Sequence, residues 1–206
     1  MSNRLLRAGL HLFLWLILLG VSPFAGAEDE RPKVLVKTDL GLMVFELFPE
    51  KAPKTVANFL TYVDAQFYNG TIFHRVVPGF VVQGGGMTYD FTKKETRATI
   101  PGESDNGLSN EPMTLAMARN SDPDSADSQF FINLNYNRSL DASENQAGYT
   151  VFGRLITGVD TVIAIVEEPQ GRYDDYPHAP NIPVRILSAR RLAQSEWKNE
   201  QQSQTP

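Results

Sequence analysis

Short apolar runs typical of β-strands recur along most of the chain, and two stretches change to a helical period. From Pro53, the apolar residues Val56, Phe59, Leu60 and Val63 follow the spacing i, i+3, i+4 and i+7. This spacing predicts an amphipathic helix with proline near its first turn. The same kind of spacing predicts a second helix over residues 159–166. The run 73–85 is strand-like, as are residues 34–36, 43–47, 71–73, 114–118, 129–133, 149–156 and 184–189.

About eight short strands, together with two helices, are enough for a sheet that closes on itself. Eight strands can form a barrel whose interior is filled by side chains, and closure leaves no exposed sheet edge. We therefore predict a mainly β fold, a closed eight-stranded antiparallel β-barrel capped by two α-helices, as one domain over residues 33–192. A filled interior has no room for a ligand, so a binding site must lie on the outer wall or at a rim.

The first 27 residues have the order of segments found in secretory signal peptides. Arg4 and Arg7 precede an apolar run over residues 10–19, and the small residues 25–27 come just before an acidic stretch. The apolar run is shorter than the roughly 20 residues of a membrane-spanning helix, although an uncleaved anchor is the alternative. We expect cleavage after Ala27, a periplasmic location and no stable membrane anchor. A mobile lead-in is expected over residues 28–32, and a disordered polar tail over residues 193–206.

Net charge and cysteine content limit the partners and the compartment that we expect for this protein. The full chain has a net charge of −5, and residues 1–27 contain two arginines and no acidic residue, so the mature charge would be −7. No basic stripe remains, and we expect no nucleic-acid partner. The chain contains no cysteine, so its fold needs no disulfide. This suits an oxidising compartment. We expect a monomer, because no coiled-coil pattern or large apolar stripe is present.

Two motifs about fifty residues apart are the candidates for chemistry. The run 73–85 (FHRVVPGFVVQGG) places Arg75 and Gln83 in otherwise apolar strand sequence, and the run 128–132 (SQFFI) follows downstream. A charged residue between apolar neighbours needs an explanation. From this run alone, an outward-facing Arg75 in a surface ion pair is a simpler explanation than a catalytic Arg75. In the second run, residues two apart share a face of the strand. Gln129 and Phe131 therefore lie on one face, while Phe130 points into the core.

Together and in this order, the two motifs resemble the cyclophilins, the barrel-type peptidyl-prolyl cis-trans isomerases, over nearly the whole of residues 33–192. The resemblance implies that Arg75 is the catalytic donor and that Gln83 orients it. It also implies a substrate groove, along which Ala118, Arg119 and Asn120 would contact bound peptide. The other residues expected to bind substrate are Phe80, Val81, Gln129, Phe131, Leu140 and Tyr149.

The chemistry implied by this resemblance needs neither a nucleophile nor a cofactor. Rotation about an X-Pro amide has a barrier of roughly 18–20 kcal/mol, because the C–N bond has partial double-bond character. A twisted amide frees the nitrogen lone pair, which a fixed guanidinium can stabilise. The expected substrates are unfolded or partly folded proline-containing polypeptides, with envelope or secreted proteins as the clients.

The sequence also departs from the family pattern at two groove positions. Many eukaryotic members have a tryptophan where this chain has Ser139, and a histidine where it has Tyr149. Several bacterial exported members also lack the tryptophan, and the chain resembles these most. We expect weak binding of cyclosporin, because the indole N–H that donates to this drug is missing.

Other patterns favour simpler interpretations or rival functions. The three glycines 84–86 are interpreted as a flexible turn rather than a phosphate cradle, and Asp122, Asp124 and Asp127 as a solvated loop rather than a calcium site. We expect no metal site. Two alternatives to the isomerase stay open: a proline-peptide-binding chaperone module with little turnover, and a calcium- or metal-dependent hydrolase of the envelope.

Overall fold

The computed structural model describes residues 31–174 and 176–203. The predicted signal peptide and residues 28–30 of the predicted lead-in lie outside this part of the chain. The helices are α1 (Pro53–Asp64), α2 (Val159–Glu167) and α3 (Gln194–Ser203), with a short 3-10 turn η1 (Arg138–Leu140). The strands are β1 (Lys33–Thr38), β2 (Gly41–Leu47), β3 (Ile72–Phe73), β4 (Arg75–Val77), β5 (Val81–Gly84), β6 (Thr114–Met117), β7 (Phe130–Asn133), β8 (Val151–Thr157), β9 (Gln170–Tyr173), β10 (Tyr176–Pro180) and β11 (Val184–Leu192).

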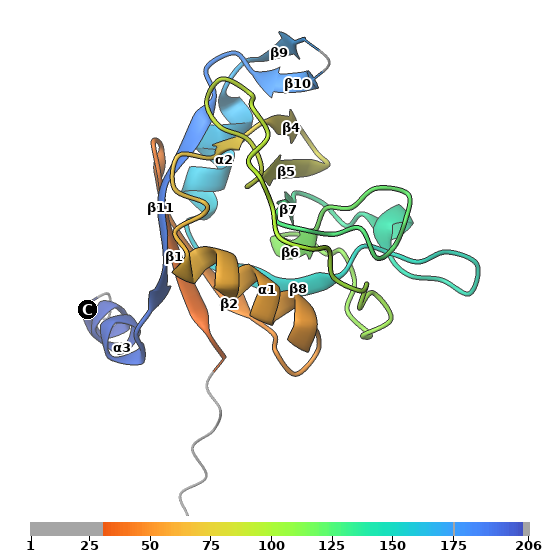
Figure 1. The fold of residues 1–206 in the computed structure, drawn as a ribbon. Helices are drawn as coiled ribbons and strands as arrows, with labels where there is room; N and C mark the ends of the chain where they lie inside the picture. The colour runs from red at the N-terminus through yellow and green to blue at the C-terminus, as the bar shows by residue number, and fades with distance from the viewer. Residues whose placement is uncertain (1–30, 175, 204–206) are drawn as a thin grey trace, which may run out of the picture. The chain divides into compact units, whose positions relative to one another are not determined.

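The main sheet is antiparallel and nearly closed, as Figure 1 shows. Its strand order is β3-β11-β1-β2-β8-β6-β7-β5-β4. The two end strands, β3 and β4, are consecutive in the chain and are separated only by His74. Counted as one interrupted strand, they give the eight strands expected from the sequence; counted apart, they give nine. The prediction of a mainly β barrel is therefore confirmed.

Aromatic rings fill the interior of this barrel. The Phe130 ring is fully buried and lies 5.5 to 6.3 Å, centroid to centroid, from four other aromatic rings, those of Phe45, Phe59, Tyr68 and Phe73. Helix α1 contributes Phe59 to this cluster, and its predicted apolar face is buried. Rings at these separations and tilts attract one another beyond the area that they bury. The core thus uses the face of β7 that the alternation assigned to it.

A small hairpin is present that the sequence pattern did not predict. Strands β9 and β10 pair with each other and lie outside the main sheet, beside β4 (Figure 1). Most residues of the two strands are exposed or half-buried, only Ala179 and Pro180 are buried, and the apolar alternation that marks a half-buried strand is missing. The hairpin packs through Ala179 and Tyr176 in a small cluster that also contains Phe91. The Phe91 ring stacks on the exposed Tyr173 ring as well, with ring centroids 4.1 Å apart. A tertiary contact thus stabilises strands that local pattern did not reveal.

The two ends of the described chain are more ordered than the sequence suggested. Where we expected a disordered tail, helix α3 begins at Gln194, and the carboxylate of Glu196 accepts a hydrogen bond from the Ala193 N–H and pairs with Arg190. Arg31, in the expected mobile lead-in, forms ion pairs with Glu46 and Glu50. The contacts of Arg31 reach β2 and the turn after it, whereas those of Glu196 lie within six residues along the chain, and composition alone shows neither. Within residues 31–174 and 176–203, no helix has the length and apolar character needed to span a bilayer.

His74 is buried between β3 and β4 and has an altered pKa. Burial, together with the neighbouring charge of Arg75, lowers the pKa of His74 to about 4. Its Nδ1 atom has no hydrogen-bond partner among the described residues. The imidazole is therefore neutral in the folded protein at pH 7.

We expect this histidine to make stability fall in mild acid. As the pH decreases from about 6.5 to 4, the unfolded chain takes up the proton first, so the free energy of unfolding should drop by about 3 kcal/mol. Urea unfolding at pH 7.5 and pH 4, on the wild type and on His74→Phe, measures this contribution. The variant keeps a ring but loses the titration, so equal acid sensitivity of the two proteins would contradict the assignment.

Candidate active site

A row of side chains crosses five strands on the outer face of the barrel. Arg75 lies opposite Gln83, Gln83 opposite Phe131, Phe131 opposite Ala116, and Ala116 opposite Val151. Directly opposed residues of neighbouring strands point to the same face of a sheet. The preceding or following residue on each strand points inward, as the buried Val76, Val82, Ile132 and Leu115 do. Strand register thus places a guanidinium, an amide and apolar side chains in line.

The polar end of the row is a hydrogen-bonded chain of three side chains. Arg75 donates from Nη1 to Oε1 of Gln83 at 3.3 Å, and Gln83 donates from Nε2 to Oε1 of Gln129 at 3.1 Å. The Arg75 guanidinium also lies 5.8 Å from the centroid of the Phe80 ring. Partial burial lowers the pKa of Arg75, yet an arginine stays charged at neutral pH.

The alternative of a surface ion pair finds no support at Arg75. None of the ion pairs formed within the described part of the chain includes Arg75. Its described partners are an uncharged amide and an aromatic face. Because no carboxylate neutralises the guanidinium there, it is available to a ligand at the edge of the groove.

The apolar end of the row is a separate cluster from the barrel core. Its buried residues are Val81, Ala116, Phe131 and Val151, and those packed against it are Phe80, Leu108, Ala118, Leu140 and Tyr149. The rings of Phe131 and Tyr149 meet edge to face, 5.6 Å apart. Phe131 is only 4% exposed, so it forms the floor, while the partly exposed Phe80, Leu140 and Tyr149 form the walls.

Three members of this cluster were not among the predicted site residues. Ala116 and Val151 face the groove because of strand register, which joins segments far apart in the chain. Leu108 comes from the long loop before β6. An alternating pattern in β6 could have marked Ala116 as facing away from Leu115, but could not have indicated which face carried the groove.

Arg119 supports the groove wall. Its guanidinium lies 4.5 Å from the centroid of the Tyr149 ring and donates to the carbonyl oxygens of Gly148 and Asn120. Asn120 is exposed, and its N–H donates to the Ser125 hydroxyl within the same loop. The structure therefore brings Arg119 to the groove through Tyr149, whereas the described hydrogen bonds of Asn120 lie within the loop and to Arg119.

A buried asparagine network holds Phe80 and the segment before Leu140. Asn133 donates to Oδ1 of Asn110 at 3.1 Å, and Asn137 donates to Oδ1 of Asn133 at 2.7 Å and to the Phe80 carbonyl at 2.9 Å. Leu140 follows within η1, where its N–H donates to the Asn137 carbonyl. Buried amides with satisfied hydrogen bonds make such loops rigid. The groove walls are thus held by contacts from behind.

The family comparison agrees with this geometry. A family model described as "Cyclophilin type peptidyl-prolyl cis-trans isomerase/CLD" matches residues 33–191. The chain belongs to the cyclophilin family. The enzyme class follows from this membership and from the names of the relatives below: it is a peptidyl-prolyl cis-trans isomerase of the cyclophilin type.

Curated relatives and solved structures point the same way. A peptidyl-prolyl cis-trans isomerase of Acinetobacter baylyi is 50% identical over 75% of this chain and 82% of its own length. Peptidyl-prolyl cis-trans isomerase A of Dickeya dadantii is 43% identical over 92% of this chain and 98% of its own length. A crystal structure of a Cryptosporidium parvum cyclophilin, determined in the presence of the dipeptide Ala-Pro, has a TM-score of 0.68. It is 29% identical and covers 79% of this chain and 99% of that one.

The three glycines after Gln83 are packed in this cyclophilin, so their interpretation as a flexible turn is wrong. All three are buried. A Cβ on Gly84 would lie 2.8 Å from the Ile72 carbonyl oxygen, where β5 approaches β3 and the barrel closes. Gly85 has φ +84°, a left-handed conformation that favours glycine.

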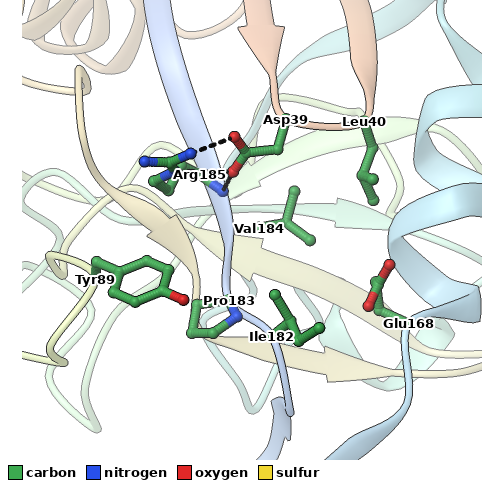
Figure 2. A pocket seen from close by; sticks show the side chains of 8 residues that line it. All are labelled: Asp39, Leu40, Tyr89, Glu168, Ile182, Pro183, Val184 and Arg185. Atoms are coloured by element: carbon green, nitrogen blue, oxygen red, sulfur yellow. Dashed lines mark hydrogen bonds and ion pairs between the residues drawn. The ribbon is translucent and has the colours of Figure 1, made fainter.

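A second hollow on the cyclophilin domain is distinct from the groove. It is a pocket of about 280 Å³. Figure 2 shows Leu40, Ile182 and Pro183 in its lining, together with the Arg185–Asp39 ion pair. None of its lining residues belongs to the row or to the predicted site. Across residues 31–174 and 176–203, no group of three or more histidine, cysteine, aspartate or glutamate residues is placed to hold a metal ion.

Proposed function

We propose that this cyclophilin accelerates rotation about X-Pro bonds of polypeptides bound along the outer groove, with Arg75 as the donor to the twisted amide. The observation that carries the proposal is the row itself. A half-buried guanidinium without an acidic partner in the described chain lies in register with an apolar cluster on the barrel wall. The proline ring occupies the cluster, and the guanidinium faces the bond that turns.

The proposed mechanism depends on binding the twisted amide more tightly than either planar form. As the C–N bond turns, the nitrogen lone pair leaves resonance and becomes a hydrogen-bond acceptor. The Arg75 guanidinium donates to it, and this gain exists only near the transition state. Gln83 holds the guanidinium in place and offers its amide to a substrate carbonyl. No covalent bond is made or broken in this step.

A peptide-binding module with little turnover is the rival to this proposal. A binding module and an isomerase would both bind a proline-containing peptide, but only the isomerase would interconvert the cis and trans forms of its X-Pro bond. Exchange spectroscopy on a short X-Pro peptide, with the domain of residues 31–203 present in catalytic amounts, separates them. We expect exchange cross-peaks between the cis and trans signals. Binding shifts without cross-peaks would establish the module instead.

The proposed substrates are unfolded or partly folded proline-containing polypeptides. The groove lies on the outer wall, where an extended chain can reach it without entering the barrel. The Cryptosporidium parvum relative was crystallised in the presence of Ala-Pro, a dipeptide that contains an X-Pro bond. A monomer suffices for this function, because every residue of the proposed site comes from one chain.

We further propose that the enzyme is an exported, periplasmic member of the family that acts on envelope or secreted proteins. The support is the order of charged, apolar and small residues over residues 1–27. In addition, the alignment with the Dickeya dadantii relative covers 92% of the chain. The similarity therefore extends beyond residues 33–191, which the family model matches.

Fractionation of expressing bacteria, followed by mass spectrometry of the amino terminus, tests the proposed export. We expect the osmotic-shock fraction to contain a chain that begins at Glu28. An uncleaved chain in the cytoplasmic fraction would contradict export, while leaving the isomerase proposal intact.

A further inference from the structure

Gly86 lies against the side chain of Gln129, the third member of the polar chain. An ideal Cβ built on Gly86 would collide with Cγ of Gln129 and would lie 2.8 Å from its Cδ and 2.9 Å from its Nε2. Cβ atoms in real proteins essentially never approach so closely. Any side chain at position 86 would therefore displace Gln129.

The neighbouring backbone leaves little room to relieve this contact. The Gly86 carbonyl accepts the Lys94 N–H at 3.0 Å, and the next residue, Met87, pairs with Lys93 and accepts the Ile72 N–H at 2.9 Å. Gly86 itself does not have the left-handed φ that Gly85 has. Its need for glycine therefore comes from the contact with Gln129 and not from backbone conformation.

The position of Gln129 determines which end of the Gln83 amide faces Arg75. Gln83 donates from Nε2 to Gln129, and this leaves its Oε1 to accept from Arg75. An amide has its donor and its acceptor on opposite arms. If Gln129 moves, the Gln83 amide can turn, and its NH₂ group would then face a guanidinium that has no acceptor.

We propose that Gly86 is a positioning residue for the isomerase: its missing side chain keeps Gln129 where it orients Gln83 toward Arg75. The inference rests on the proposed function of Arg75. It assigns a role to the last of the three glycines, which has no part in closing the barrel and no left-handed backbone.

Gly86→Ala tests the proposal. We expect the exchange rate at saturating peptide to fall about tenfold, which corresponds to the loss of about one well-placed hydrogen bond. The Gln83 side-chain NH₂ resonances should shift, while the melting temperature changes little. The matched control is Gly171→Ala, where a Cβ meets only the end of the Asn181 side chain. We expect wild-type exchange and unchanged Gln83 resonances there.

Gln129→Ala completes the test as a double-mutant cycle. Once Gln129 is truncated, the three atoms nearest to a methyl group at position 86 are gone. Gly86→Ala/Gln129→Ala should therefore be as active as Gln129→Ala alone. The proposal would be overturned if the loss of activity in the double variant equalled the product of the two single losses. Wild-type exchange in Gly86→Ala would overturn it as well. The Gln83 resonances report the geometry without turnover, so an inactive wild type would refute the proposed function while the role of Gly86 could still be judged.

Discussion

Arg75→Ala is expected to lower kcat/KM for X-Pro isomerisation by about 100- to 1,000-fold, the loss seen when a preorganised donor to a transition state is removed. Arg75 is half-buried and contacts the Gln83 amide and the Phe80 ring. It takes part in no ion pair within the described chain, so its removal leaves no carboxylate unpaired there. We therefore expect the free energy of unfolding to change by less than about 1 kcal/mol. A proline-limited refolding assay and urea unfolding measure the two quantities.

Arg75→Lys is the matched variant for this prediction. Lysine keeps the charge but loses the planar fork of N–H donors that can reach Gln83 and the substrate together. We expect activity between that of the wild type and that of Arg75→Ala. An alanine variant with near-wild-type activity would remove Arg75 from its proposed role, whatever lysine does.

Phe130→Ala is expected to lower the free energy of unfolding by about 3–5 kcal/mol, the range found when a large buried aromatic is truncated. Phe130 is 1% exposed, and its ring packs against Phe45, Phe59, Tyr68 and Phe73 in the barrel interior. Small domains are stable by only about 5–15 kcal/mol. Urea unfolding measures the loss, and Phe130→Leu, with a smaller expected loss, keeps the measurement possible if the alanine variant does not fold.

Phe131→Leu is the matched comparison on the neighbouring residue. Phe131 points to the opposite face of β7 and forms the floor of the groove against Tyr149. We expect its replacement to reduce kcat/KM several-fold with a smaller loss of stability than Phe130→Leu. If Phe131→Leu were the more destabilising change and left activity intact, the assignment of the two faces would be wrong.

The opposite directions of Phe130 and Phe131 could be predicted from the sequence. Alternation along one strand placed the two rings on opposite faces, and the core and groove clusters confirm it. Helix α1 was predicted from the spacing of Val56, Phe59, Leu60 and Val63, all of which are buried. Both are properties of a few consecutive residues, so no knowledge of distant contacts was needed.

Specific contacts that neither composition nor local pattern shows explain what was missed. Helix α3 begins where Glu196 accepts the Ala193 N–H and pairs with Arg190, although its composition suggested disorder. The buried glycines 84–86 were interpreted as a flexible turn, because the sequence does not show which atoms lie against them. Ala116 and Val151 gave no signal of a site until register aligned them with Phe131.

For this protein, local pattern determined helices α1 and α2, the strands of the main sheet, the faces of α1 and β7, and the two motifs that contain Arg75, Gln83, Gln129 and Phe131. These depend on the spacing of neighbouring side chains along a helix or strand. Only the tertiary structure decided that Arg75, Gln83 and Phe131 stand side by side on three strands, and that Gln129 lies over Gly86. The physical reason is that register and close packing join residues about fifty positions apart, and the local sequence carries no information on such distances.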